Sequence, residues 1–148
     1  MLYWWPIVKH FSDFLGKRTE FAEPWNIYPG SKGSAKPFPC IEVQWDQEAA
    51  LSVHKPNQGS LVLWIDIWVA SDEVEQDDVY RQQYEAQSAI FASLREWSNA
   101  LKEELNLAVK LECPGIISQG TITRPTFGCR MIINIEWRGG KNYGYSED

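Results

Sequence analysis

One run of residues, SLVLWIDIWVA at positions 60–70, limits the possible folds more than any other part of the chain. Apolar side chains occupy its odd-numbered positions from 61 onwards, which predicts a β-strand with one buried face. The even face is also largely apolar, with Trp64 and Trp68 on either side of Asp66. Because both faces are apolar, we expect both to be covered by other groups.

Two segments have the spacing of amphipathic helices. Near the N-terminus, apolar residues recur every three or four positions between Pro6 and Gly16, which predicts a short helix over about residues 4–15. A long helix is predicted from about residue 78 to residue 105, lying on a sheet. Its expected buried stripe consists of Tyr80, Tyr84, Ile90, Phe91, Leu94, Trp97, Leu101 and Leu105.

Alternating patterns predict the remaining strands. In residues 40–48, Ile41, Val43 and Trp45 alternate with polar residues, as expected of a half-buried strand. The other strands are predicted over residues 108–111, 116–123 and 127–138, with a turn at Pro114-Gly115. The fold class is therefore α+β, with a mixed or antiparallel sheet of four to five strands. One long helix and a short N-terminal helix pack on this sheet, in a single domain of residues 1–148.

Residues 16–39 contain four prolines, so no regular element is expected there. This long loop carries Trp25 and Tyr28 among its aromatic residues. A long loop inside a compact domain is often functional. It can wrap its own domain or reach a neighbour, and both possibilities remain open. Residues 139–148 are expected to form a flexible tail.

Charge is concentrated in one segment. Residues 72–104 carry nine acidic and three basic residues, a net charge of −6 that equals the net charge of the whole chain. Such an acidic segment opposes phosphate binding, so we expect no tight binding of nucleic acid. No apolar run approaches the roughly 20 residues of a membrane helix, and the opening residues resemble neither a signal peptide nor an anchor. No membrane association is expected.

The residues that catalysis requires are scarce. His10 and His54 are the only histidines, and each is expected to be a surface residue. The phosphate-loop, dinucleotide-binding and zinc-protease motifs are absent from the sequence. Cys40, Cys113 and Cys129 are widely spaced and are expected to be reduced thiols. We therefore expect no enzymatic activity, no cofactor and no metal.

The second face of the strand at residues 60–70 is the stronger functional indication. The long helix can cover only one face of the sheet, and the other face would then expose Trp64 and Trp68, which is typical of an interface. The alternative is that the N-terminal helix and residues 16–39 cover this face. Asp66 should meet Arg130 or Arg138, or a donor from a neighbouring chain. The predicted oligomer interface consists of Trp64, Asp66, Trp68, Ile132, Trp25 and Tyr28.

The order of these elements, and the apolar pattern of the strands among them, resemble those of a known protein family. An N-terminal helix is followed by PCIEVQWDQE, GSLVLWIDIWVASDE, the helical DDVYRQQYEAQSAIFASLREW and the closing RPTFGCRMIINIEWR. This layout, which covers about two thirds of the chain, is similar to that of the tail-terminator and tail-completion proteins at the neck of long-tailed bacteriophages.

The resemblance implies a structural protein of a phage or prophage. Its subunits would close into a homo-oligomeric ring, typically a hexamer, that caps the tail tube and contacts tail-tube and head-connector proteins. It would be found in the virion, and in the host bacterial cytoplasm during assembly. The acidic helix suits a surface past which DNA slides. The alternative is a monomeric binding domain that uses the aromatic sheet face and residues 16–39 as a pocket.

Overall fold

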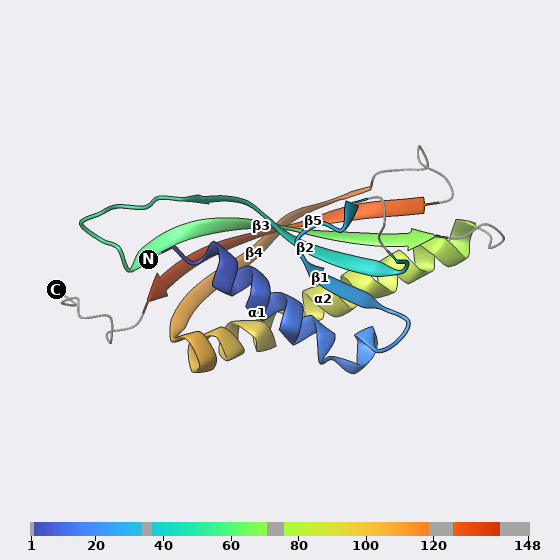
Figure 1. Cartoon of the computed structure of the whole chain (residues 1–148), viewed down its shortest axis with the longest axis horizontal. Coiled ribbons are helices and arrows are strands. Elements are labelled where there is room, and N and C mark those ends of the chain that lie inside the picture. The colour runs from blue at the N-terminus through green and yellow to red at the C-terminus, as the bar shows by residue number, and fades with distance from the viewer. Residues whose placement is uncertain (1, 34–36, 71–75, 119–125, 140–148) are drawn as a thin grey trace.

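The computed structural model describes residues 2–33, 37–70, 76–118 and 126–139. Five strands form one mixed sheet in the order β1-β2-β3-β5-β4, and two helices pack on it, so the predicted α+β class is confirmed (Figure 1). The elements in chain order are α1 (Trp4–Gly16), the 3₁₀ turn η1 (Thr19–Phe21), β1 (Asn26–Pro29), β2 (Cys40–Ala49), β3 (Gln58–Ala70), α2 (Gln76–Leu105), β4 (Leu107–Ser118) and β5 (Thr126–Gly139).

Strand β3 lies at the centre of the sheet. It pairs antiparallel with β2 on one side and with β5 on the other, and Asp66 lies opposite both Glu42 and Arg130. Strand β4 continues the antiparallel pairing beyond β5, whereas β1 pairs parallel with the first residues of β2. This position pairs both edges of β3, whereas its two apolar faces are covered separately, one by the helices and the other in part by side chains of the neighbouring strands.

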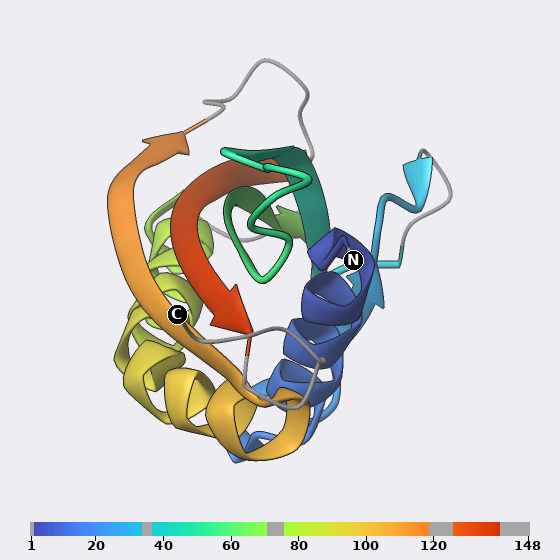
Figure 2. The same cartoon turned by 90° about the vertical axis from the view of Figure 1, so that its left-hand side faces the viewer.

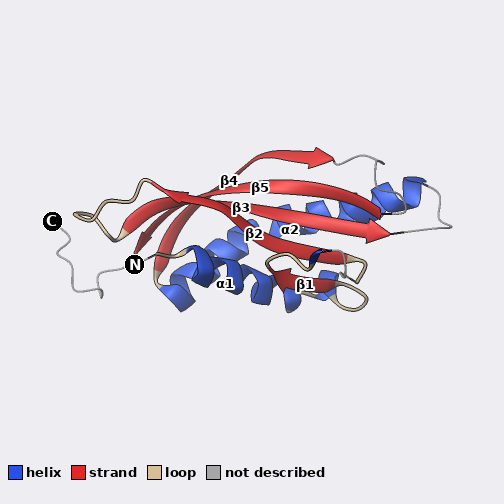
Figure 3. Cartoon of the chain, turned by 45° about the horizontal axis from the view of Figure 1, so that its top comes forward, coloured by secondary structure: helices blue, strands red, loops and turns tan. Residues whose placement is uncertain are grey.

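Both helices lie on the same face of the sheet (Figure 3). Helix α1 packs against β1 and β2, and α2 packs against β3, β4 and β5. The odd-numbered side chains of β3 point into this layer and are buried, as are Ile133 of β5 and Trp97 of α2. The helices therefore cover one face, here called the inner face, and α1 does not cover the opposite, outer face.

The prediction that residues 16–39 contain no regular element is wrong, because η1 and β1 lie within them. Strand β1 lies parallel to the start of β2, with Ile27 beside Ile41. After β1 the chain folds over the outer face, where the backbone N–H of Lys32 donates to the Glu42 carboxylate at 2.6 Å. This part of the segment therefore wraps its own domain. Residues 34–36 and the predicted tail beyond residue 139 lie outside the described residues.

The predicted turn at Pro114-Gly115 is also wrong. Residues 107–118 form one continuous strand, β4, whose register against β5 shifts between Glu112 and Gly115. Because β4 is an edge strand, Pro114 can lie in it without removing an interior hydrogen bond of the sheet. Most of the strand predicted over 116–123 lies outside the described residues.

Part of the predicted buried stripe of α2 is exposed. Ile90, Leu94, Trp97 and Leu101 are buried, but Tyr80, Tyr84 and Phe91 are exposed. Each of these three aromatic residues directly follows a buried residue, namely Val79, Gln83 and Ile90. One residue corresponds to a rotation of about 100° around a helix, so this aromatic row lies on the flank of α2 beside its buried face.

The strand residue Trp45, also expected to be buried, is exposed at the register shift of β2.

The close approach of Gly59 to Trp137 leads to a stability prediction. A Cβ atom at Gly59 would lie 2.8 Å from a ring carbon of Trp137 and 2.9 Å from Leu51. The Trp137 ring is buried and cannot easily move, so Gly59→Ala should lower the free energy of unfolding by about 1–3 kcal/mol, measured by urea denaturation. Gly115→Ala is the matched control, since nothing lies within 4 Å of its added Cβ. Equal effects of the two variants would contradict the prediction.

Candidate functional site

The outer face of the sheet carries five of the six predicted interface residues. The register places Tyr28, Glu42, Asp66 and Arg130 in one row across β1, β2, β3 and β5. Trp64 and Trp68 flank Asp66 along β3, and Ile132 lies opposite Trp64. Alternation along the strands directs these side chains away from the helices. The sequence prediction therefore gathers these five residues correctly on one face, whereas their role as an interface stays a prediction.

Asp66 is the centre of a hydrogen-bond network within the chain. It is 2% exposed, and its carboxylate accepts hydrogen bonds from Arg130 Nε at 2.7 Å and Arg130 Nη2 at 3.0 Å. Gln44 Nε2 donates to the same carboxylate at 2.8 Å. The hydrogen bonds to Asp66 raise the pKa of Arg130 above its ordinary value, although partial burial opposes the shift. Of the partners expected for Asp66, namely Arg130, Arg138 or a donor from a neighbouring chain, the structure shows Arg130.

The two tryptophans of this face are also held by the chain itself. The Arg130 guanidinium carbon lies 3.8 Å from the centre of the Trp64 ring, in a cation–π contact. Trp68 Nε1 donates to the buried Glu42 carboxylate at 2.9 Å, and the same carboxylate receives the N–H of Lys32. The outer face is therefore an ordered surface on which Arg130 and Glu42 hold the two tryptophan rings.

Trp25 lies apart from the other predicted interface residues. It meets Phe21 edge-on, with the ring centres 5.6 Å apart, and it packs against the core on the helix side of the sheet. With Pro24, Gln82 and Ala86 it lines a hollow of about 490 Å³ beside α2. Trp25 and the tryptophans of β3 therefore do not line one common pocket.

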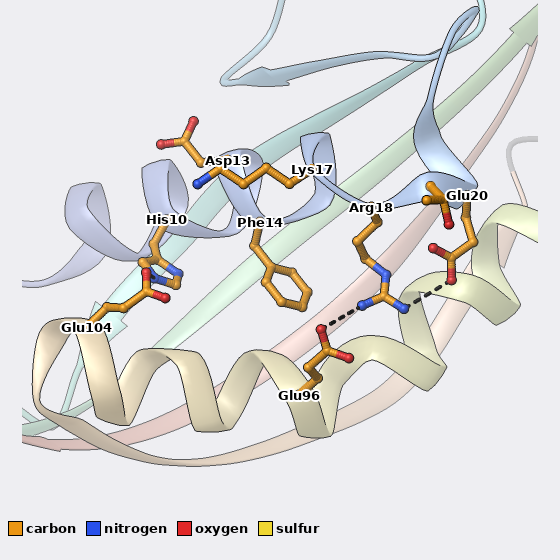
Figure 4. A pocket seen from close by; sticks show the side chains of 9 residues that line it. His10, Asp13, Phe14, Lys17, Arg18, Glu20, Glu96 and Glu104 are labelled. Atoms are coloured by element: carbon orange, nitrogen blue, oxygen red, sulfur yellow. Dashed lines mark hydrogen bonds and ion pairs between the residues drawn. The ribbon is translucent and has the colours of Figure 1, made fainter.

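His10 is not the plain surface residue that the sequence indicates. Its side chain is mostly buried between the two helices, beside Glu104 of α2 (Figure 4). Trp97 Nε1 donates to His10 Nδ1 at 3.0 Å. An indole N–H can only donate, so Nδ1 is the acceptor and Nε2 carries the hydrogen that faces Glu104 at 2.8 Å. This arrangement joins α1 to α2.

The open cavity beside His10 is lined by ion pairs. It measures about 520 Å³, and Arg18 bridges Glu20 at 3.0 Å and Glu96 at 3.1 Å across it (Figure 4). The bond from Arg18 holds the pKa of the Glu20 carboxyl below its ordinary value. Because Arg18 is already paired with two carboxylates, this cluster serves to connect α1, η1 and α2.

Two exposed apolar surfaces were missed by sequence reasoning. The first is a groove of about 710 Å³ between α2 and the edge strand, called the α2–β4 groove. Its lining is mixed: the apolar part is Phe91, Ala92, Leu94, Leu111 and Cys113, and the polar part is Arg95, Ser98, Asn99 and Glu112. Phe91 is 60% exposed and Tyr84, on the same flank of α2, is 67% exposed. A row of helix residues that each follow a buried residue has the same three- and four-residue spacings as the buried row itself. Periodicity alone therefore could not separate this flank from the buried stripe.

The second surface lies at the start of the chain and is called the tryptophan patch, formed by Leu2, Trp4, Trp5 and Trp45. Trp4 stacks on Trp45 with ring centres 4.3 Å apart and meets Trp5 edge-on at 6.2 Å. Leu2, Trp5 and Trp45 are exposed. The available sequence signal was the adjacent pair Trp4-Trp5, because Trp4 falls on the helical stripe of Ile7, Val8 and Phe11, whereas Trp5 points about 100° away from Trp4.

The cysteines carry no sign of reactivity. All three are free thiols, and burial raises the pKa of Cys113 and of Cys129. Among the residues that the structure describes, no group of three or more metal-ligating side chains is assembled. Within the same residues, no helix is both long and apolar enough to cross a membrane.

Comparison with known proteins assigns neither a family nor a function to this chain. No protein-family model matches the chain, and no curated protein matches it.

Proposed function

We propose that this chain is a phage or prophage structural protein that forms a ring, which caps the tail tube or joins the tail to the head. One observation carries the proposal: exposed apolar surfaces lie at opposite edges of a single sheet. These are the α2–β4 groove and the tryptophan patch. The order of elements is the one on which the resemblance to tail-terminator and tail-completion proteins rests.

Exposed aromatic side chains favour association with other subunits. Phe91, Tyr84 and Trp5 are each about half or more exposed. Fully burying an aromatic side chain removes about 150–250 Å² from water, and such rings are enriched in interfaces. Two different surfaces on one subunit favour head-to-tail contacts, which close into a ring when the rotation between subunits permits.

The charge distribution suits a ring around a DNA passage. The segment 72–104 has a net charge of −6, and Glu85, Glu96 and Glu103 of α2 are exposed. Carboxylates repel phosphate, so DNA could pass such a surface without binding tightly. The proposed partners are therefore further copies of the chain, tail-tube protein and head-connector protein.

The competing function is a monomeric binding domain with a pocket between the aromatic sheet face and residues 16–39. The positions of the aromatic residues disfavour it. Trp25 lies on the helix side of the sheet, whereas Trp64 and Trp68 lie on the outer face and are engaged by Arg130 and Glu42. The ring is thus the better supported function.

The mass of the protein in solution tests this proposal. Native mass spectrometry and light scattering over a range of concentrations should show a closed oligomer, a fixed multiple of the 17.1 kDa chain. Added to polymerising tail-tube protein from the same phage genome, the oligomer should stop elongation. A strict monomer at all concentrations, with no effect on tube growth, would contradict the proposal and favour the binding domain.

A further inference from the structure

We infer that the hollow between Trp25 and α2 binds a small organic cation, an ammonium group joined to an apolar or aromatic body. This hollow of about 490 Å³ is called the Trp25 pocket, and its lining includes Pro24, Trp25, Glu85 and Ala89. It lies on the helix side of the sheet, and therefore differs from the pocket against the outer face that the sequence offers as an alternative. The inference is independent of the proposed ring, because one chain forms the pocket.

The pocket lies where the chain passes α2 after the end of α1. Helix α1 lies beside α2 on the inner face (Figure 2). The turn η1 follows α1 and is tied to α2 by Arg18, which bridges Glu20 of η1 and Glu96 of α2. On the α2 side, Ala86 and Ala89 belong to the lining. Their short side chains leave room between the two segments.

The wall of the pocket opposite α2 is held by hydrogen bonds within the chain. Asn26 Nδ2 donates to the Pro24 carbonyl at 3.1 Å and to the Pro39 carbonyl at 3.3 Å. The Trp25 backbone N–H donates to the Ala22 carbonyl at 3.1 Å. Pro24, Trp25 and Pro39 all line the pocket, so its wall is in place before a ligand enters. A site that is already ordered loses less conformational entropy when a ligand binds.

Aromatic and proline side chains give the pocket an apolar surface. Phe21 is buried and meets the Trp25 ring edge-on, with the ring centres 5.6 Å apart. Trp25 is only partly buried, so part of it remains open to a ligand. The volume of the pocket lies in the range of sites that enclose a whole small molecule. We therefore assign the pocket to a free ligand and not to a single side chain of a partner protein.

The charges of the pocket favour a cation. The described residues that line it include two carboxylates, Glu20 and Glu85, but no lysine, arginine or histidine. Glu20 is already paired with Arg18, whereas Glu85 is exposed and makes no ion pair among the described residues. The negative face of an aromatic ring such as that of Trp25 also attracts a cation that lies within about 6 Å of its centre. The carboxylate and the ring thus act in the same sense, and both disfavour an anion.

Two arginines close in sequence to the lining residues are engaged elsewhere. Arg81 precedes Gln82 of the lining, and its guanidinium pairs with Asp78 at 2.8 Å. The guanidinium of Arg18 is shared between Glu20 and a second carboxylate of α2. Within the part of the chain that the structure describes, no basic side chain therefore occupies the position that an ammonium ligand would take.

Three probes that differ in one polar group test the preference for a cation. Phenethylamine, phenethyl alcohol and phenylacetate carry an ammonium, a hydroxyl and a carboxylate group on the same kind of aromatic body. Isothermal titration calorimetry of the unmodified protein at neutral pH should show binding of phenethylamine, about 10-fold weaker binding of phenethyl alcohol and no binding of phenylacetate. Equal affinities for the amine and the alcohol, or no binding of the amine, would overturn the inference.

Glu85→Gln tests which carboxylate attracts the amine. It should reduce the preference for the amine over the alcohol from about 10-fold to about 2-fold, because the amide keeps the shape of the side chain without its charge. Glu85 is exposed, so thermal unfolding should stay as in the parent. Glu103→Gln, which removes an exposed carboxylate of α2 outside the pocket, should keep the full preference. An equal fall in both variants would assign the attraction to the acidic helix as a whole and contradict the site.

Ala89→Leu tests the place of binding, because the larger side chain fills the space between α2 and Trp25 and should abolish binding of the amine. Ala92→Leu is the matched control. Ala92 lies further along α2, is exposed and lines the α2–β4 groove instead, so its replacement should leave binding unchanged. Full binding of the amine by a folded Ala89→Leu variant would place the ligand elsewhere and defeat the inference. If circular dichroism shows that the added bulk disturbs the fold, the comparison of Glu85→Gln with Glu103→Gln decides.

A blocked lysine distinguishes a free ligand from a protein side chain. Nα-Acetyl-lysinamide carries its ammonium group on an aliphatic stem, which fills less of the pocket than an aromatic body, so it should bind more weakly than phenethylamine. Tighter binding of the blocked lysine would assign the pocket to a partner's side chain and overturn the inference of a small-molecule ligand. None of these results bears on the ring, whose test is the mass of the oligomer, since the pocket is complete within each subunit.

Discussion

Arg130→Leu is expected to lower the free energy of unfolding by about 3 kcal/mol, because it leaves a buried carboxylate without its cation. Asp66 is 2% exposed and receives two of its three hydrogen bonds from Arg130. The Gln44 amide alone cannot offset the charge. We place the effect at the lower end of the usual range because 27% of the Arg130 side chain is exposed and water there weakens the pair.

Arg138→Leu is the matched control for this prediction. Arg138 lies on the same face of β5 but is exposed, and it lies opposite Gln58 instead of Asp66. Its replacement should change stability by no more than about 0.5 kcal/mol in urea denaturation. The double variant Asp66→Leu/Arg130→Leu should recover much of the loss, since both charges are then removed together. Equal losses for Arg130 and Arg138 would contradict the assignment of Arg130 as the essential partner.

The strand at residues 60–70 and the need of Asp66 for a charged partner could be predicted from sequence because both follow from local chemistry. Alternation along residues 60–70 gives the two faces of β3 directly. A lone carboxylate on such a strand needs a donor, and only a few arginines are placed to supply one. The choice of Arg130 over Arg138 is set by the register of β3 against β5, which the sequence did not predict.

The elements that the sequence did not predict depend on distant contacts. Strand β1 has only four residues and forms because β2 offers its edge in parallel, a pairing that no local pattern of residues 26–29 indicates. Pro114 and Gly115 are ordinary turn residues, and only the edge position of β4 allows a strand to pass through them. In both cases tertiary structure overrides local preference.

The exposed surfaces were missed for a related reason. Apolar residues were assigned to the interior, and the sequence does not reveal which of two adjacent apolar residues faces the core. In α2 the buried positions include Gln83 and Ser93, while the larger Tyr84 and Phe91 are exposed. The helical spacing of apolar residues therefore placed Tyr84 and Phe91 inside and did not indicate Gln83 and Ser93. The excess of apolar residues over core positions was itself the sign that some of them serve a surface.

The contact between the two helices leads to the second large prediction. Trp97→Ala should lower the free energy of unfolding by about 3–5 kcal/mol, the usual cost of deleting a fully buried tryptophan side chain. The Trp97 ring is fully buried, and its centre lies 4.1 Å from that of Phe11 in α1. Its N–H also donates to His10. The substitution thus removes both packing and a hydrogen bond where α1 meets α2.

Trp97→Phe separates these two contributions, because phenylalanine keeps an aromatic ring against Phe11 but cannot donate to His10 Nδ1. We expect it to cost about 1–3 kcal/mol, from the lost hydrogen bond and the smaller ring. His10→Ala should then cost less in the Trp97→Phe background than in the parent, since the bond from Trp97 is already absent there, whereas the contact with Glu104 is lost in both. Trp5→Ala is the control for tryptophan loss as such: it is 49% exposed, and its removal should cost no more than about 0.5 kcal/mol. If Trp5→Ala and Trp97→Ala were equally destabilising in urea denaturation, Trp5 would be held in the core and could not serve as a free anchor for a neighbouring copy.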